Sequence, residues 1–146
     1  MAQEVIIEKN LTFAKFIAVA RDHANVRLSA NAKDLIIQGR KRVEEAISSG
    51  QTIYGINTGF GELSSVRISS DDLEELQTNI IRSHASGVGE NLPMEVVRGA
   101  MLLLVNSLSK GNSGVRKLVV DQIVNLLNAN ITPVVPSIGS LVSGVS

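Results

Sequence analysis

The spacing of apolar and polar residues predicts a mainly helical chain with one or two short strands near its N-terminus. Residues 5–8 and 25–28 form the two stretches predicted to be strands. Between them, Thr12 is a suitable N-cap for a helix that begins at Phe13. The buried face of this helix is predicted to consist of Phe13, Phe16, Ile17 and Ala20.

A longer helix is predicted after the second strand. Ser29 is expected to cap it, and it should reach Ser48 or Ser49 before Gly50 ends it. Gly39 weakens this helix by roughly 1 kcal/mol relative to alanine. Its buried stripe is predicted to be Ile36, Val43 and Ile47.

Three further helices follow an irregular, glycine-rich stretch at residues 52–65. The capping-box pattern at residues 69–72 predicts a helix toward His84. Pro93 suits the first turn of the next helix, which should run to Lys110 and stop at Gly111. Ser113 is expected to cap the last helix, which ends near Asn128 before prolines end regular structure. Its buried face is predicted to be Val120, Ile123, Val124 and Leu127.

The predicted helix 93–110 is apolar on almost every side, with few polar positions. A helix of this kind belongs inside a larger assembly, and a chain of 146 residues has little material to surround it. The pattern therefore predicts that this helix packs against partner chains, with a homo-oligomer as one expected arrangement.

Composition excludes several classes of function. The 14 basic and 14 acidic side chains balance, so nothing favours binding to nucleic acid or to a membrane. The chain has no cysteine and only two separated histidines, so neither thiolate chemistry nor a metal site is expected. No secretory signal is recognised, and the apolar run 100–105 is too short to span a bilayer. A cytoplasmic location is the expectation.

Two glycine-rich turns carry the candidate chemistry. The only tyrosine, Tyr54, lies in the run Tyr54–Gly61, and His84 lies in the run Arg82–Gly89. Glycine allows positive φ and close approach of a ligand, so polar side chains among glycines indicate site loops. The alternative is that both are ordinary turns, with a solvated Tyr54 and with His84 capping the preceding helix. His23 is interpreted as a surface histidine.

These residues resemble the aromatic amino-acid ammonia-lyase family, and within it the histidine ammonia-lyases. Five ordered blocks carry the resemblance across nearly the whole chain, at residues 54–61, 76–89, 106–111, 113–116 and 133–140. The resemblance implies non-oxidative deamination of L-histidine to urocanate and ammonia. It also implies a long helical-bundle lyase, a site-bearing region to about residue 92 and the start of the bundle at about 93–146.

The resemblance implies a role for each candidate site residue. Tyr54 would take the β-proton, and His84 would bind substrate and assist proton handling. Ser83 and Gly61 would contact the substrate, since the Ser-His pair goes with histidine in this family. No external cofactor is implied, because the family forms a methylidene-imidazolone (MIO) electrophile from its own Ala-Ser-Gly.

The sequence departs from the family where the electrophile would form. Val142-Ser143-Gly144 stands in place of Ala-Ser-Gly, with one residue fewer upstream. The β-branched Val142 would crowd a tight backbone cyclisation. The expectation is therefore that MIO does not form and that this chain is a truncated, inactive fragment.

Two alternatives remain open. One is a tyrosine or phenylalanine ammonia-lyase, or an aminomutase, of the same family. The other is a non-catalytic helical interaction module, or one half of a split lyase, that uses the apolar helix 93–110 to bind a partner chain.

Overall fold

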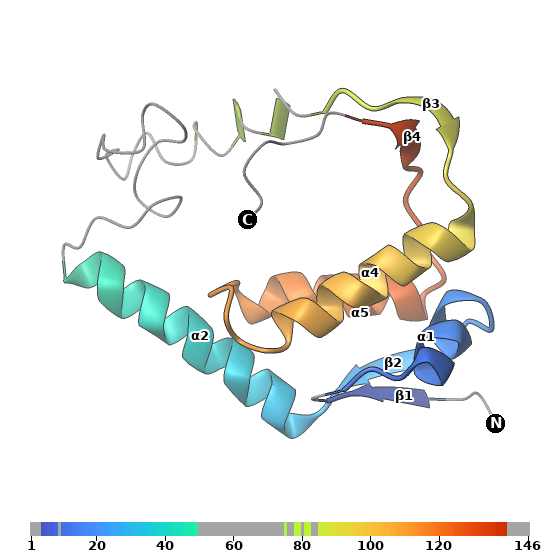
Figure 1. The fold of residues 1–146 in the computed structure, drawn as a ribbon. Helices are drawn as coiled ribbons and strands as arrows, with labels where there is room; N and C mark the ends of the chain where they lie inside the picture. The colour runs from blue at the N-terminus through green and yellow to red at the C-terminus, as the bar shows by residue number, and fades with distance from the viewer. Residues whose placement is uncertain are drawn as a thin grey trace. The chain divides into compact units, whose positions relative to one another are not determined.

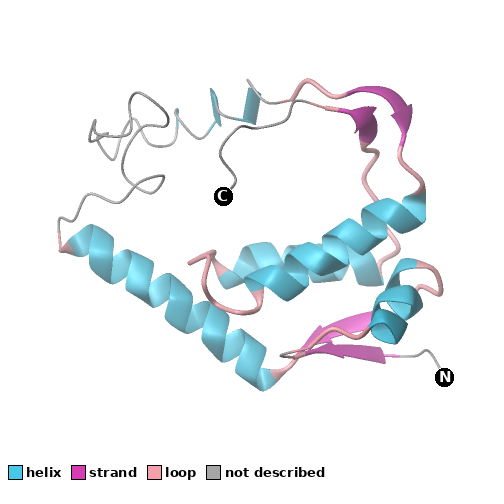
Figure 2. Cartoon of the chain, in the orientation of Figure 1, coloured by secondary structure: helices cyan, strands magenta, loops and turns pink. Residues whose placement is uncertain are grey.

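A computed structural model describes residues 4–8, 10–49, 75, 78–79, 81–82 and 85–139. Helices make up most of the described structure, so the prediction of a mainly helical chain is confirmed (Figures 1 and 2). In chain order the elements are β1 (Glu4–Ile7), α1 (Phe13–Ala20), β2 (Asn25–Leu28), α2 (Ala30–Ser48), β3 (Val88–Asn91), α4 (Met94–Leu108), α5 (Lys117–Asn128) and β4 (Pro136–Ile138).

The chain forms two compact units, each made of two stretches of sequence. The first combines residues 1–43 with 91–135, and the second combines residues 44–90 with 136–146. The predicted division near residue 92 follows family resemblance rather than compactness, and it stays a prediction.

The first unit is built on a parallel pair of strands, β1 and β2, joined through α1. Val5 pairs with Val26 and Ile7 with Leu28, and all four side chains are buried. Helix α1 packs on α4, α4 packs on α5, and α5 packs on β2. The core is therefore aliphatic, as the low aromatic content of the sequence requires.

Local capping explains where the first two helices begin. The Thr12 hydroxyl oxygen accepts a hydrogen bond from the Lys15 N–H at 3.3 Å, and the Ser29 hydroxyl oxygen accepts one from the Ala32 N–H at 3.1 Å. Both bonds satisfy N–H groups that have no partner within the helix. The predicted caps at Thr12 and Ser29 are thus confirmed.

Arg98 lies fully buried in the apolar helix α4, and the sequence pattern alone did not single it out. Its Nε and Nη2 atoms donate to the Val19 carbonyl oxygen at 3.2 and 3.1 Å, and Nη1 donates to that of Leu127 at 3.3 Å. Val19 and Leu127 lie in the last turns of α1 and α5. One guanidinium thus caps two helix C-termini, where carbonyls need donors and the helix dipole favours a cation. Burial lowers the pKa of the Arg98 guanidinium from its ordinary value.

The turn between α4 and α5 packs directly against α2 through glycines. A Cβ atom on Gly39 would lie 2.1 Å from the Gly111 carbonyl oxygen, and one on Gly114 would lie 2.2 Å from Val43 Cγ2. Gly111 and Gly114 also have φ angles of +74° and +61°. Gly39 therefore serves close packing, which outweighs its low helix propensity.

Four sequence predictions are corrected here. Phe13 is 79% exposed, because α1 packs through its C-terminal residues Ala18–Ala20. Ile47 is exposed, since the first unit ends at Val43. Ser113 does not cap the last helix: the positive φ of Gly114 interrupts helical geometry, and α5 starts at Lys117 after Arg116. Pro136 begins β4 instead of ending regular structure, as a proline can at the first residue of a strand.

The remaining predictions for the last two helices are confirmed in outline. Helix α4 runs from Met94 to Leu108 behind Pro93, and the positive φ of Gly111 follows it. Val120, Val124 and Leu127 of α5 are buried, and Ile123 is half-buried against the core. His23 is exposed as predicted, with Nδ1 2.9 Å from Asn130 Oδ1.

The second unit contains the pair β3–β4, which the sequence analysis did not predict. Within the predicted helix toward His84, the described residues 75, 78–79 and 81–82 are helical. The Ala85 N–H donates to the Ile81 carbonyl oxygen at 3.1 Å. β3 begins at Val88, after Gly87.

Candidate functional site

The predicted site residues all lie outside the described part of the chain. They are Tyr54, Gly61, Ser83, His84, Val142, Ser143 and Gly144. Their roles stay predictions. The structure describes β3, which follows Ser83 and His84 in the chain, and β4, which precedes Val142, Ser143 and Gly144.

The β3–β4 pair joins the segment that follows His84 to the segment that precedes Val142. His84 lies four positions before Val88 of β3, and Val142 lies four positions after Ile138 of β4. The pairing of β3 with β4 therefore brings together the two stretches of sequence that flank these positions.

Glycine makes this pairing close. Gly89 has φ of +92°, and a Cβ atom there would lie 3.0 Å from the Ser137 hydroxyl oxygen. A Cβ atom on Gly87 would lie 3.0 Å from Pro136 Cγ. Gly87 and Gly89, which the sequence predicts to belong to a site loop, thus allow β3 and β4 to pack closely.

Two other family-like blocks have a structural role in the described chain. Residues 106–111 and 113–116 form the end of α4 and the glycine turn that packs on α2. The buried Ser109 hydroxyl donates to the Asn106 carbonyl oxygen at 2.8 Å, which stabilises the end of α4. These blocks shape the scaffold, and no described contact gives them a chemical role.

The outer face of α4 remains apolar and exposed. Val96, Leu103 and Leu104 are 47%, 52% and 48% exposed, and they recur at helical spacing on one side. This observation agrees with the expectation that the helix needs further protein to cover it.

Among residues 4–139 as described, no group of three or more His, Cys, Asp or Glu side chains could hold a metal ion. No helix in the same part of the chain is long and apolar enough to cross a membrane.

Comparison with known proteins identifies the family. The family model for aromatic amino acid lyases matches residues 11–144, so the chain belongs to the aromatic amino acid lyase family. It is 47% identical over 141 residues to a histidine ammonia-lyase of Caldanaerobacter subterraneus subsp. tengcongensis, covering 97% of this chain and 28% of that protein. It is 50% identical over 132 residues to histidine ammonia-lyase 2 of Fusobacterium nucleatum, covering 90% of this chain and 26% of that protein.

Solved structures agree with this assignment. Histidine ammonia-lyase from Trypanosoma cruzi matches with a TM-score of 0.85 and 37% identity, over 94% of this chain and 27% of that one. Tyrosine aminomutase from Streptomyces globisporus matches with a TM-score of 0.86 and 33% identity, over 94% and 26%. The chain thus spans about a quarter of the length of these relatives.

Proposed function

We propose that this chain carries part of the active site of a histidine ammonia-lyase, which converts L-histidine to urocanate and ammonia. The observation that carries the proposal is the similarity to proteins named histidine ammonia-lyase, at 47% and 50% identity over nearly the whole chain. The Ser83-His84 pair, which resembles the pair that goes with histidine as substrate, supports the same choice.

In this proposal Tyr54 is the base that takes the β-proton of histidine. A phenol with an unperturbed pKa of about 10 is a weak base at neutral pH, so the site must stabilise the phenolate. His84 binds the substrate and assists proton handling, and Ser83 and Gly61 contact the substrate.

The residues of the electrophile position do not fit the family's MIO group. Val142 replaces the alanine of Ala-Ser-Gly, and its branched Cβ opposes the tight turn that cyclisation requires. No step of the reaction is therefore assigned to MIO in this chain. We infer that the chain alone releases no urocanate, and that it needs further protein to complete the site.

A complementation assay tests the proposal. The chain is mixed with a C-terminal part of the Caldanaerobacter relative that begins before its Ala-Ser-Gly position, so that the relative supplies the electrophile that this chain does not form. Urocanate is followed by its ultraviolet absorbance. Restored turnover of L-histidine that Tyr54→Phe abolishes supports the proposal, and His23→Gln serves as the exposed control. Turnover that survives Tyr54→Phe would refute the role of Tyr54 as the base. Turnover of tyrosine in place of histidine would refute L-histidine as the substrate.

The similarity to tyrosine aminomutase favours a second candidate within the family, because its TM-score of 0.86 is as high as the 0.85 of the histidine enzyme. Its lower sequence identity makes it the weaker choice.

The exposed apolar face of α4 supports an interaction module as the third candidate. If the chain self-associates and the mixture stays inactive with every amino acid, the interaction module replaces the lyase. The predicted homo-oligomer and cytoplasmic location belong to this proposal and are tested by sedimentation and by fractionation.

A further inference from the structure

The exposed side of α4 carries a seven-residue repeat, which we call the α4 seam. The seam consists of four exposed residues at alternating spacings of four and three: Val96, Ala100, Leu103 and Ser107. This spacing places them in one line along the helix, as in the contact seam of a coiled coil. The exposed residues of α4 that follow Glu95 are all uncharged. A second helix can therefore lie along the seam without burying a charge.

Side-chain size alternates along the α4 seam. Val96 and Leu103 are large and are 47% and 52% exposed, whereas Ala100 and Ser107 are small. In an antiparallel pair of two such helices, Leu103 of one copy faces Ala100 of the other, and Val96 faces Ser107. Every layer then holds one large and one small side chain, which is the arrangement that lets facing helices interdigitate. A parallel pair would set large against large and leave gaps between the small residues.

The charges at the two ends of α4 favour the same orientation. Glu95 lies in the first turn of α4, and Lys110 follows its last residue by two positions. An antiparallel pair brings Lys110 of each copy toward the Glu95 end of the other and sets the two helix dipoles in opposite directions. A parallel pair would place Lys110 beside Lys110. Glu95 already pairs with Arg21 at 2.7 Å at an exposed site, so this charge contact selects orientation more than it adds affinity.

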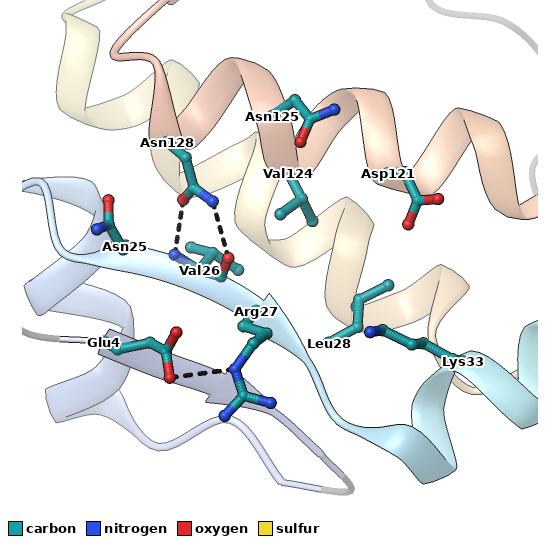
Figure 3. Close-up of a pocket in the computed structure, with 10 residues that line it drawn as sticks. All are labelled: Glu4, Asn25, Val26, Arg27, Leu28, Lys33, Asp121, Val124, Asn125 and Asn128. Carbon is teal, nitrogen blue, oxygen red and sulfur yellow. Dashed lines mark hydrogen bonds and ion pairs between the residues drawn. The ribbon is translucent and has the colours of Figure 1, made fainter.

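The groove between β2 and α5 differs from the seam, because the polar groups that line it pair with one another (Figure 3). The Val26 N–H donates to Asn128 Oδ1 at 2.7 Å, and Asn128 Nδ2 donates to the Val26 carbonyl oxygen at 2.9 Å. Arg27 Nε and Glu4 Oε2 form an ion pair at 3.1 Å. These four residues have partners within the chain, whereas the seam leaves apolar surface to be covered.

We propose that the α4 seam is a self-association surface, on which α4 of a second copy of this chain packs antiparallel. The interface is isologous, because each copy contributes the same four residues. A helix of this length is about 22 Å long, and one pair of such helices buries much less than the roughly 800 Å² per partner of a standard interface. The dimer is therefore weak, and we expect it at chain concentrations of about 10 µM to 1 mM. It does not depend on the proposed lyase function.

Sedimentation equilibrium of the whole chain over this concentration range tests the association. Leu103→Ala should raise the dissociation constant of the dimer about ten- to hundredfold, because each dimer loses two leucines from its interface. Ile37→Ala on α2 is the matched control, since Ile37 is also 52% exposed, and it should leave the dissociation constant unchanged. A chain that stays monomeric at about 1 mM, or that grows beyond dimers without an end point, overturns the proposal.

Ala100→Leu distinguishes a packed seam from unspecific apolar adhesion. The larger side chain faces Leu103 of the second copy, so the variant should weaken the dimer about tenfold. Unspecific adhesion predicts the opposite, because the variant exposes more apolar surface. Far-ultraviolet circular dichroism checks that helix content is unchanged. A dimer of Ala100→Leu that is as tight as that of the unmodified chain, or tighter, refutes the register.

Disulfide formation tests the orientation, because the chain has no cysteine of its own. Val96→Cys and Ser107→Cys variants are mixed in equal amounts and oxidised in air. A disulfide needs Cα atoms within about 7 Å, and in the antiparallel pair eleven helical residues separate the two copies of position 96 by about 16 Å. The mixed disulfide should therefore be the main product. Homodisulfides as the main product would indicate a parallel pair and contradict the proposal.

The other candidate occupant of the seam is the C-terminal part of the Caldanaerobacter relative. If the chain alone is monomeric and Leu103→Ala weakens its binding to that part, the seam binds the rest of a lyase and the self-association proposal is wrong. These measurements follow association only. A failed dimer therefore leaves the proposed lyase function untouched, and a failed complementation leaves the dimer untouched.

Discussion

Replacing Arg98 with methionine is expected to lower the free energy of unfolding by about 2–4 kcal/mol. The variant loses three bonds from a charged donor. The Leu127 carbonyl oxygen keeps the Asn130 N–H at 3.2 Å, but the Val19 carbonyl oxygen is left without a partner in the described structure. An unpaired buried acceptor costs about 1–3 kcal/mol, and the lost charged bond at Leu127 adds about 1.5–3 kcal/mol. Relief from burying a cation offsets part of the sum.

Urea unfolding followed by far-ultraviolet circular dichroism measures this loss as a lower midpoint at unchanged slope. Arg21→Met is the matched control, because Arg21 pairs with Glu95 at 2.7 Å at an exposed site and should cost at most about 1 kcal/mol. A value for Arg98→Met within about 0.5 kcal/mol of the unmodified chain would refute the capping argument.

The pH dependence follows from the lowered pKa of Arg98. The unfolded chain holds this proton more tightly than the folded one, so the contribution of Arg98 to stability rises with pH through the lowered pKa. An arginine stays charged in proteins at neutral pH, so the cost of Arg98→Met should not change between about pH 6 and pH 8. Urea midpoints at both pH values check this, and a clear slope would contradict it.

Three further results are expected. Gly39→Ala should destabilise the chain by about 1–3 kcal/mol, because the alanine Cβ would meet the Gly111 carbonyl oxygen, although alanine favours a helix by about 1 kcal/mol. Gly139→Ala, with open space around the glycine, is the control. A Gly39→Ala variant that is more stable than the unmodified chain would contradict the contact. Asn128→Leu should cost about 1–3 kcal/mol in urea unfolding through the lost clamp on β2, whereas exposed Asn125→Leu should cost little. The intact mass of the chain should be unmodified, and a loss of two waters would show that the electrophile forms.

Local chemistry made part of the fold predictable. The hydroxyl caps at Thr12 and Ser29 act within three residues, so the starts of α1 and α2 followed from the sequence. The bounds of β2 and the buried face of α5 followed from short-range patterns in the same way. The lyase family followed from ordered blocks of sequence, and the family match confirms it.

What the sequence by itself determined, then, is the set of local elements and the family. Tertiary structure decided the rest, because the deciding partners lie far away along the chain. Arg98 is one cation in an apolar helix until the ends of α1 and α5 present their carbonyls to it. Considered within α2 alone, Gly39 only lowers the helix propensity. The reason for a glycine there is the turn at Gly111, whose backbone leaves no room for a Cβ atom. The β3–β4 pair joins strands that are more than forty residues apart, and no local pattern predicts such a pairing.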